Sequence, residues 1–562
     1  SESSGAGTTR LLDNGHLLRY AKLTQQAFGD GPGAAGHVQE FDWDGHVVWD
    51  FKYASAKQLG HHDIFKMPNG NVLMIVWEKK SPDEAVAAGR RAETVGKGNL
   101  LPDCIIEVKP EGKSGGQIVW EWHVWDHLVQ DHDQSKANYG DVKAHPELID
   151  VNFGEGAMAS IVAKKEELDK LRAIGYVGAA TPGKPARVQP DWLHCNAVAY
   201  NEDLDQILLN SPEFNELWII DHSTTTDEAA SHAGGRSGKG GDLLYRWGNP
   251  RAYRAGTVKD QKLFYQHNAH FIPKGLPGAG HVLIFNNGKR RPGGAHSSVD
   301  ELVLPVDADG RYAHQTGTAY GPDQPIWSYS APKKSEFYSE FISGAHRLPN
   351  GNTFVCSGPS GTIFEVTPDK EIVWKYVNPA KIEGPPPVMP ALVDILPAFL
   401  RDTLKTTEEQ AKQFDELRKE TEVKLQALLN EEQKKVLKEP PRGGGGPGSQ
   451  AVSVLPAFLR PRLKLADDQK KQLEALQKEA EAKLDKTLTA DQRKQLKDIR
   501  DGFFNAFGGG PPGGGGGGGP PGLGSAVFRS YRYAANYAGL SGKDLTPGKT
   551  IEELQAKEPE KK

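Results

Sequence analysis

One short phrase recurs along roughly the first 380 residues and limits the folds open to the chain. It consists of an apolar residue, Trp or Tyr, a variable residue and an aromatic residue. The five copies are VWDF (48–51), VWEW (119–122), LYRW (244–247), IWSY (326–329) and VWKY (373–376). A strand with an acidic residue precedes each copy, and Asn-Gly or Asp-Gly turns separate many of the strands. Four short strands per repeat, in repeats of uneven length, predict an all-β protein of the β-propeller class.

A second repeat places histidine at one position of the first strand of several units. Four stretches align on a turn, at Asn69, Asn201, Lys274 and Asn350. The residues seven positions before these turns are His62, His194, His267 and Ser343, and those four positions before are Phe65, Val198, His270 and His346. Because the innermost strands of a propeller line its channel, we expect His62, His194 and His267 to converge there. We expect His61, His270 and His346 beside them.

Three interpretations of this histidine cluster are open on the residues alone. A metal site would use three imidazoles and leave one coordination position open. Nucleophilic catalysis would use one neutral imidazole as the attacking group and others as acid or base. In the third interpretation, each histidine packs and forms hydrogen bonds within its own blade.

Arginines near the same strands favour an oxyanion as the ligand. The turn FNNGKRRPGG (285–294) carries Arg290 and Arg291, and VFRSYRY (527–533) carries Arg529 and Arg532. Guanidinium groups suit sulfate, phosphate or carboxylate. A metal centre would instead recruit carboxylates around its imidazoles, for which Asp63 and Asp191 are available, so that alternative stays open.

Composition argues against several other function classes. The 562 residues carry a formal net charge of −5, which gives no overall signature of nucleic-acid or membrane-surface binding. No stretch of about 18 apolar residues occurs, so we expect no membrane span. Cys104, Cys195 and Cys356 are far apart in apolar settings with a spacing that fits no zinc site, so we expect buried free thiols. We interpret the start at Ser1 as a mature chain from which a signal peptide has been removed.

From residue 384 the pattern changes from strands to helices; before it, only 159–174 shows helical periodicity. Two related stretches begin at Leu396 (LPAFLRDTLK) and Leu455 (LPAFLRPRLK), and apolar residues recur in both every three or four positions. We interpret each copy as a helical hairpin on Gly/Pro-rich tethers. The phrases around Gln410 and Gln492 resemble the LTxxQ motif of small periplasmic helical proteins. The hairpins either pack on each other or contact a protein partner or a second copy of the chain.

Strand character returns after the second glycine run, at 526–537. Propellers often close by pairing the last strand with the first blade, so we predict that this stretch is the innermost strand of blade one. The predicted organisation is propeller blades over 1–383, an inserted helical region over 384–524, a closing strand within 525–550 and a charged tail over 551–562.

Several motifs together resemble the bacterial arylsulfate sulfotransferases that use no nucleotide sulfate donor. These motifs are PDWLHCNAVAYN (190–201), QHNAHF (266–271), FNNGKRR (285–291), the NGN turns and the VWxY strands. The resemblance covers residues 1 to about 380 and 526–550. It implies a six-bladed propeller, of which five repeats are visible, exported to the periplasm or the extracellular space. It also implies transfer of a sulfuryl group from an aryl sulfate to a phenol through a sulfated histidine.

The resemblance also implies roles for individual residues. His194, His267 and Arg291 match the DWxHxN, QHxA and NG-turn motifs and take catalytic roles. The sulfated histidine of the family lies beyond the Arg turn, and His346 is the one histidine in a predicted inner strand there. His346 shares its register with His270, on the opposite strand face from the main histidine position, so we predict a β-bulge at 343–345. The residues predicted to bind substrate are His61, His62, His270, Arg290, Arg529 and Arg532.

Two other functions stay open. One is a non-catalytic exported propeller that binds a partner or builds an assembly, which the helical repeats favour. The other is a metal-dependent enzyme centred on His61, His62, His194 and His267. We expect no cofactor for sulfuryl transfer, and the polyglycine runs lack the Lys-Ser/Thr of a phosphate-binding loop.

Overall fold

The chain forms two compact units. The computed structural model describes residues 3–23, 28, 31, 33–95, 99–154, 191–379, 393–396, 401, 404, 406–438, 452–455, 463, 465–493, 495–496, 526–546 and 548. The first unit comprises Ser1–Ala179, Arg187–Ile382 and Pro521–Lys562, and the second comprises Ala180–Ala186 and Glu383–Pro520. The longer segment of the second unit, Glu383–Pro520, has bounds within a few residues of the insertion predicted at 384–524.

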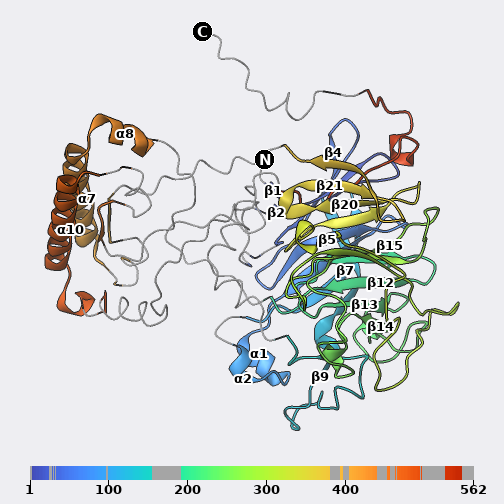
Figure 1. Ribbon diagram of the computed structural model, residues 1–562. Coiled ribbons are helices and arrows are strands. Elements are labelled where there is room, and N and C mark those ends of the chain that lie inside the picture. The colour runs from blue at the N-terminus through green and yellow to red at the C-terminus, as the bar shows by residue number, and fades with distance from the viewer. Residues whose placement is uncertain are drawn as a thin grey trace. The chain divides into compact units, whose positions relative to one another are not determined.

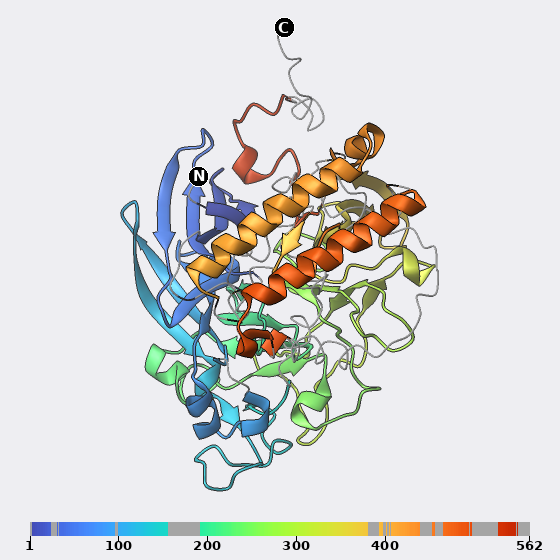
Figure 2. The same cartoon turned by 90° about the vertical axis from the view of Figure 1, so that its left-hand side faces the viewer.

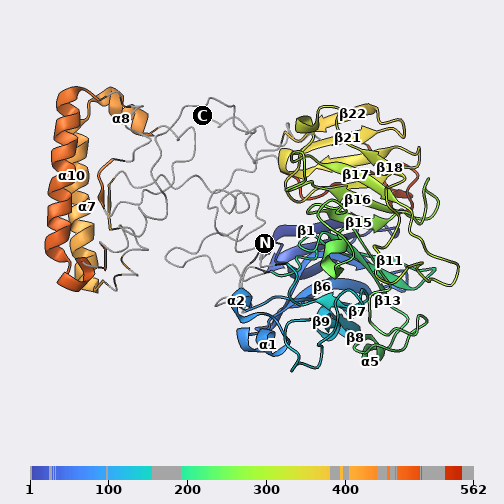
Figure 3. The ribbon, with the colours of Figure 1, turned by 60° about the horizontal axis from the view of Figure 1, so that its bottom comes forward.

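Five four-stranded antiparallel sheets make up the first unit, and each uses four strands that follow one another in the chain (Figures 1 and 3). Blade one contains β1 (Ser3–Leu11), β2 (Leu17–Leu23), β3 (Gly36–Phe41) and β4 (Val47–Lys52). Blade two contains β5 (Gln58–Lys66), β6 (Val72–Glu78), β7 (Asp103–Glu111) and β8 (Gly115–His123). Blade three contains β11 (Ala197–Asn201), β12 (Gln206–Ser211), β13 (Glu216–Asp221) and β14 (Tyr245–Trp247). Blade four contains β15 (His267–Phe271), β16 (Val282–Asn286), β17 (Ser298–Leu302) and β18 (Trp327–Tyr329), and blade five contains β19 (Gly344–Arg347), β20 (Thr353–Ser357), β21 (Thr362–Val366) and β22 (Ile372–Val377).

The first strands of successive blades contact one another, which makes them the innermost strands of a β-propeller. All five aromatic phrases lie in fourth strands, and the four histidine-repeat stretches contain the first strands of blades two to five. The propeller prediction is confirmed, with five blades. Among the described residues there is no sixth four-stranded sheet. In the described residues between blades two and three, the strands are β9 (Leu128–Val129) and β10 (Ile149–Asp150), which form a short parallel pair. Residues 155–190, including the helix predicted at 159–174, lie outside the described ranges.

In four of the five aromatic phrases, the second residue donates a hydrogen bond to the next blade. The hydrogen bonds are Trp49 Nε1–H to Gly115 O (2.9 Å), Trp120 Nε1–H to Thr224 Oγ1 (3.1 Å), Tyr245 Oη–H to Gly321 O (2.8 Å) and Trp327 Nε1–H to Pro368 O (2.8 Å). The fifth aromatic, Trp374, lies in the last blade, and the guanidinium of Arg532 lies 4.2 Å from the centre of its ring. The aromatic phrase is therefore a contact between blades.

The closing strand predicted at 526–537 is not formed. β1 pairs with β2 and already holds the innermost position of blade one. Residues 526–546 instead form an irregular segment between blades five and one. On the blade-five side, Val527 N–H donates to Gly358 O (2.9 Å) and Ser343 N–H donates to Phe528 O (3.1 Å). On the blade-one side, Leu11 N–H donates to Tyr533 Oη (3.0 Å), so the segment joins the last blade to the first without strand pairing.

Short helices occupy several loops of the propeller unit. They are α1 (Pro82–Ala87), α2 (Ala92–Val95), α5 (Thr226–Ala229) and the 3-10 turns η1 (Val124–Asp126), η2 (Pro250–Tyr253), η3 (Lys334–Glu336), η4 (Gly358–Ser360) and η6 (Ala538–Leu540). Among the described helices of both units, none combines the length and the apolar character needed to cross a membrane. The three cysteines are buried free thiols, as predicted.

The second unit is built from two long helices with a shared leucine-rich core. α7 (Glu408–Leu428) is followed by α8 (Glu431–Lys438), and α10 (Asp467–Thr487) lies beside α7 (Figures 1 and 2). A two-stranded ladder of β23 (Asp394–Ile395) and β24 (Val452–Ser453) joins the two copies. Gln410 and Gln492 exchange amide hydrogen bonds, and Gln433 and Gln469 do the same. The two copies therefore pack on each other, one of the two arrangements considered from the sequence.

Candidate active site

Three histidines enter the centre of the propeller from successive blades. His62 lies in β5, His194 precedes β11 and His267 begins β15. The ring centres of His62 and His194 are 4.3 Å apart. Tyr265 stacks on His194 at 6.0 Å and lies 5.8 Å from the ring of His267. The three imidazoles are at most 2% exposed, so the structure brings together the residues of the main histidine position in a buried cluster.

His61 contacts the ring of His62 and is itself held by Asp103 and Trp77. Its Nε2 lies 2.9 Å from Asp103 Oδ1, its Nδ1 lies 2.7 Å from His62 Nδ1, and its ring stacks on Trp77 at 4.0 Å. Both ring nitrogens of His61 therefore have protein partners. This arrangement fits a residue that orients His62, and it fits the predicted role of substrate ligand less well. Burial, and then the neighbouring His194, lower the pKa of His62 well below its usual value, so His62 is neutral at pH 7.

Asp191 holds His194 through two hydrogen bonds. The backbone N–H of His194 donates to Oδ1 (3.1 Å) and its Nδ1–H donates to Oδ2 (2.5 Å). Burial disfavours the imidazolium, but the Asp191 carboxylate more than offsets this, and the pKa of His194 is raised. Burial also raises the pKa of Glu213 to about 7, although His194 nearby acts to lower it. The site therefore places an imidazole whose charged form Asp191 favours near a carboxyl group whose pKa is about 7.

The hydrogen bonds of His267 fix its tautomer. Asn287 donates its two amide hydrogens to the carbonyls of Ser339 (2.8 Å) and Ile342 (3.0 Å), which turns its Oδ1 toward His267. His267 Nδ1 lies 2.8 Å from that oxygen and so carries the proton. The lone pair is then on Nε2, which is buried and has no hydrogen-bond partner among the described residues. Burial lowers the pKa of His267 to about 3, so this imidazole is neutral at pH 7.

Arg529 brings a positive charge into the cluster from the C-terminal segment. Its Nη1 donates to Asp63 Oδ2 (3.1 Å), its Nη2 is 3.5 Å from the carbonyl of Asn196, and its side chain is 3% exposed. Its charge lowers the pKa of both His62 and His267. Burial would raise the pKa of Tyr531, but Arg529 and Arg10 more than offset this and lower it. Arg529 is thus the predicted guanidinium whose charge acts on the central histidines.

His270 and His346 form a second group beside the first. β19 pairs with β20 without a register shift from Gly344 to Arg347, so the bulge predicted at 343–345 is wrong. The irregularity comes before the strand, where Ile342 and Ser343 have φ values of 46° and 87°. His346 keeps the register it shares with His270, and its Nε2 lies 3.1 Å from the N–H and 3.2 Å from the carbonyl of Arg532. Burial lowers the pKa of His270 to about 3 and that of His346 to about 4.

The remaining predicted arginines lie in different surroundings. Arg291 places its guanidinium against its own turn, 3.1 Å from both His296 Nε2 and Ser298 Oγ. Arg290 is exposed, with a left-handed φ of 62°, and its charge acts on Glu213. Arg532 forms an ion pair with Glu365 and lies over Trp374. Of these three, Arg290 is the one whose charge reaches a neighbour of His194.

Sequence reasoning missed three supporting side chains. They are Asp103, Glu213 and Asn287. Asp103 and Glu213 stand in stretches with no local motif, and their partners lie in other strands. Asn287 is in the FNNG turn that was singled out for its arginines, but nothing in the turn shows a contact with a histidine 20 residues earlier.

A cavity of about 340 Å³ lies away from this cluster. Its lining includes Trp125, Tyr139, His145 and His232, and none of the predicted site residues. At the histidine cluster itself, the half-buried Tyr265 lies against two of the histidines, with Lys289 Nζ 4.8 Å from the centre of its ring. A substrate therefore needs movement of nearby side chains to reach His267.

Comparison with known proteins adds a family assignment to this geometry. A family model described as "Arylsulfotransferase (ASST)" matches residues 3–432. The curated protein "Arylsulfate sulfotransferase AssT" from Escherichia coli O6:H1 (strain CFT073) is 23% identical over 338 residues, which are 59% of this chain and 50% of that protein. The chain thus matches half the length of this relative.

Solved structures resemble the chain only distantly. A protein of unknown function from Bacteroides caccae is 11% identical, with a TM-score of 0.32 over 66% of this chain and 81% of that one. A catalytically inactive virginiamycin B lyase from Staphylococcus aureus is 8% identical, with a TM-score of 0.29 over 67% and 71%. At such scores neither similarity supports an inference about function.

Proposed function

The chain belongs to the arylsulfotransferase (ASST) family, and we propose that it moves a sulfuryl group from an aryl sulfate to a phenol through a sulfated histidine. The observation that carries the proposal is the state of His267. Its Nδ1–H is held by Asn287, its Nε2 lone pair has no hydrogen-bond partner among the described residues, and its low pKa keeps it neutral. These are the properties of a nucleophilic imidazole.

The chemistry divides into two half-reactions. In the first, His267 Nε2 attacks sulfur, the bond from sulfur to the aryl oxygen breaks, and the leaving phenolate takes a proton from His194. In the second, a phenol returns a proton to His194 while its oxygen attacks sulfur and the N–S bond breaks. Arg529 stabilises negative charge on the sulfuryl oxygens in both steps. The cycle needs neither a nucleotide nor a cofactor.

His346, which the family resemblance favours as the sulfated residue, is the second candidate. Its low pKa keeps it neutral, and its Nδ1 is buried with no hydrogen-bond partner among the described residues. Its Nε2, however, is occupied by the backbone of Arg532. We therefore place it after His267.

Mapping of the sulfated peptide decides between the two histidines. The full chain is exposed briefly to ³⁵S-labelled 4-nitrophenyl sulfate, quenched at alkaline pH and digested. We expect the label on the peptide that contains His267, and expect His267→Ala to lose both label and turnover. His194→Ala should slow both half-reactions and leave the label on His267. Label on His346 would reassign the nucleophile.

Steady-state kinetics test the reaction class separately. A sulfated intermediate predicts parallel double-reciprocal plots when 4-nitrophenyl sulfate and phenol are varied together. The absence of transfer across a broad panel of aryl sulfates and phenols would leave the non-catalytic propeller as the better interpretation. Metal analysis of the purified chain, combined with loss of turnover on chelation, would favour the metal-dependent alternative.

We also propose that the protein works outside the cytoplasm, in the periplasm or the extracellular space. The family resemblance supports this location, and small molecules such as aryl sulfates and phenols are then its partners. Cell fractionation checks it, because recovery of the native protein with the cytosol would contradict export. A partner or a second copy bound through the helical unit stays a prediction, which the mass of the purified protein in solution would test.

A further inference from the structure

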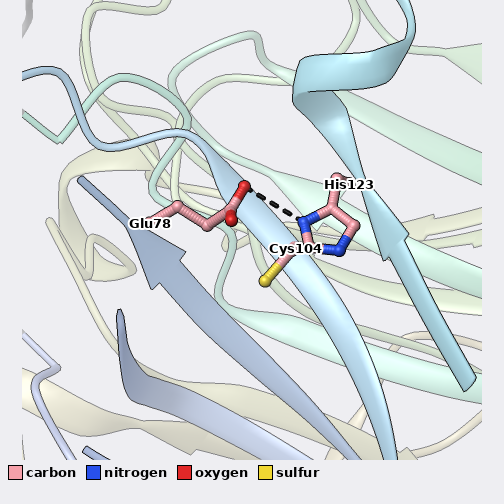
Figure 4. Close-up of side chains that lie close together, drawn as sticks. All are labelled: Glu78, Cys104 and His123. Atoms are coloured by element: carbon pink, nitrogen blue, oxygen red, sulfur yellow. Dashed lines mark ion pairs between the residues drawn. The ribbon is translucent and has the colours of Figure 1, made fainter. Parts of the chain in front are cut away.

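Glu78, Cys104 and His123 project together from one end of blade two (Figure 4). Cys104 in β7 is the direct cross-strand partner of His123 in β8 and of Val76 in β6. Glu78 follows Val76 by two residues, so its side chain points to the same face of the sheet. A thiol sulfur, an imidazole nitrogen and a carboxylate oxygen thereby come within 4.8 Å of one another.

The carboxylate and the imidazole are close, but they are not aligned as a hydrogen bond. His123 Nδ1 lies 3.1 Å from Glu78 Oε2, yet this buried oxygen accepts no hydrogen bond from any described residue. Zn–N and Zn–O bonds of about 2.0 Å would separate two tetrahedral ligand atoms by about 3.3 Å. The observed spacing, which is that of an ion pair, is also compatible with two donor atoms that share one ion.

Neighbouring polar side chains contact His123 and Glu78, as second-layer residues do around the ligands of metal sites. Glu121 Oε2 lies 3.1 Å from His123 Nε2, which gives the carboxylate–histidine pair that commonly orients a metal-binding imidazole. Gln58 Nε2 lies 3.4 Å from the other oxygen of Glu78. Lys80 Nζ is 3.9 Å from Glu78 Oε2 and would have to move aside for a cation.

We propose that Glu78, Cys104 and His123 form a zinc site with three protein ligands and one open position. Sulfur, nitrogen and oxygen donors together suit zinc better than the hard cations calcium and magnesium. The His123 side chain is 21% exposed and gives an ion a route from solvent to the buried Cys104. Cysteine spacing alone predicted no zinc site, because the three ligands come from separate strands and meet only through sheet pairing.

The site is separate from the histidine cluster. Trp77 and Asp103, next in sequence to Glu78 and Cys104, point to the opposite face of blade two. There they contact Asp191 and His61. Loss of zinc and loss of sulfuryl transfer are therefore distinguishable results.

Zinc takes cysteine as the thiolate and histidine as the neutral imidazole, so zinc binding releases protons and we expect it to become tighter as the pH rises.

Cobalt(II) substitution identifies the ligands directly. The purified full-length protein is treated with a chelator, desalted and titrated with cobalt(II). A thiolate-to-cobalt charge-transfer band that saturates at one ion per chain is the expected result. The other clusters of metal-binding side chains among the described residues, His127–His232–Asp242 and Asp42–Asp44–His46, contain no cysteine and cannot give this band. No thiolate band in the wild-type protein would overturn the proposal.

Variants add a matched comparison. Cys104→Ser should abolish the band, while Cys356→Ser, which changes another buried cysteine, should keep it. Glu121→Gln keeps all three ligands and should weaken zinc affinity by roughly 10- to 100-fold. If Cys104→Ser does not fold, the wild-type spectrum and Glu121→Gln still decide. Unchanged zinc affinity in Glu121→Gln, or a band that survives in Cys104→Ser, would contradict the site.

Discussion

At the scale of single residues, several residues at the centre of the propeller have an uncommon backbone conformation. His62 and His194 both have φ values of 54°, a left-handed conformation that is uncommon for residues other than glycine. Ser343, at the equivalent position of blade five, has a φ of 87°. Such conformations persist when the surrounding structure enforces them, and they concentrate at functional sites. In blade four the left-handed residue is Asn268, with a φ of 53°, one position after His267, so the conformation is shared by the repeat position in blades two, three and five.

Three histidines that stay neutral in the folded protein predict how its stability changes with pH. His267, His270 and His346 have pKa values of about 3, 3 and 4, against 6.5 for an ordinary histidine. As the pH falls from about 6.5 toward 4, the unfolded chain binds protons that the folded chain does not. The free energy of unfolding should therefore fall, by up to about 1.4 kcal/mol per pH unit for each such histidine.

Denaturant unfolding at pH 7, 6 and 5 measures this slope. All 11 tryptophans lie in the propeller unit, so their fluorescence follows that unit alone. His346→Gln should reduce the slope by about one histidine's share. His46→Gln, at a side chain that is 77% exposed, should leave it unchanged. A slope in His346→Gln equal to that of the wild type would mean that the folded protein does not hold His346 in its neutral form.

The ion pair of Arg529 and Asp63 predicts that substitutions at these two residues have non-additive effects on the free energy of unfolding. Both side chains are almost fully buried, at 3% and 1% exposed, so Arg529→Met leaves a buried carboxylate with the more distant Arg10 at 3.7 Å. We expect a loss of about 3–5 kcal/mol in the free energy of unfolding. Adding Asp63→Asn should restore more than half of it. Arg311→Met, which removes an exposed ion pair, is the control, and additive effects of Arg529→Met and Asp63→Asn would refute the coupling.

At the scale of elements, the fourth strand of each blade is the connection to its neighbour. Four of the five aromatic phrases donate a hydrogen bond from Trp or Tyr to the following blade, and the fifth packs on Arg532 of the C-terminal segment. The repeat thus encodes how blades associate, in addition to the packing within one blade.

Removing one of these contacts tests that role. Trp120 is 4% exposed and donates to Thr224, so Trp120→Phe keeps an aromatic ring but loses the hydrogen bond and some volume. We expect the propeller to lose about 1–2 kcal/mol of unfolding free energy. Trp43→Phe, at a side chain 42% exposed, should have no measurable effect. Equal stability of the two variants in urea unfolding would argue against Trp120 as a contact between blades.

At the scale of the whole molecule, two units with separate cores share one chain. The leucine-rich core of the second unit contains residues from Val393 to Leu488 only, and the propeller cores contain none of these. The C-terminal segment belongs to the propeller unit, with Val527 packed against a core cluster of blade five. We therefore propose that the helical unit is an insertion between parts of one fold.

This organisation predicts the effects of two deletions. Replacement of 383–520 by a flexible Gly/Ser linker should leave the tryptophan-detected unfolding midpoint unchanged, because the propeller keeps its core and its C-terminal segment. Truncation after Ile382 should lower that midpoint, because it removes Arg529 from Asp63 and the hydrogen bonds to blades five and one. If the linker replacement lowered the unfolding midpoint more than the truncation did, the helices would be shown to support the propeller.

Several features could be predicted from the sequence because they are local and repeated. The aromatic phrases identify the fourth strands, and the histidine spacing identifies the approach to the inner strands. β1 was missed because its SSGAGTTRL stretch is rich in small residues with weak strand propensity. The aromatic stretch at 526–537 looks more like a strand, but the position beside β2 was already taken by β1. Contacts such as His61 with Asp103, or Glu78 with His123, depend on pairing between strands far apart in sequence.

The position of Arg529 near the end of the chain also sets an order of events during synthesis. Its partner Asp63 is 466 residues earlier. At about 5–20 residues per second, a ribosome finishes blade two some tens of seconds before Arg529 is made. Once His267 has been made, the nascent chain carries all three central histidines, but until Arg529 follows it lacks the ion-pair partner of Asp63 and the segment that joins the last blade to the first. A product that stops short of the C-terminal segment would therefore carry the histidines in an unclosed ring.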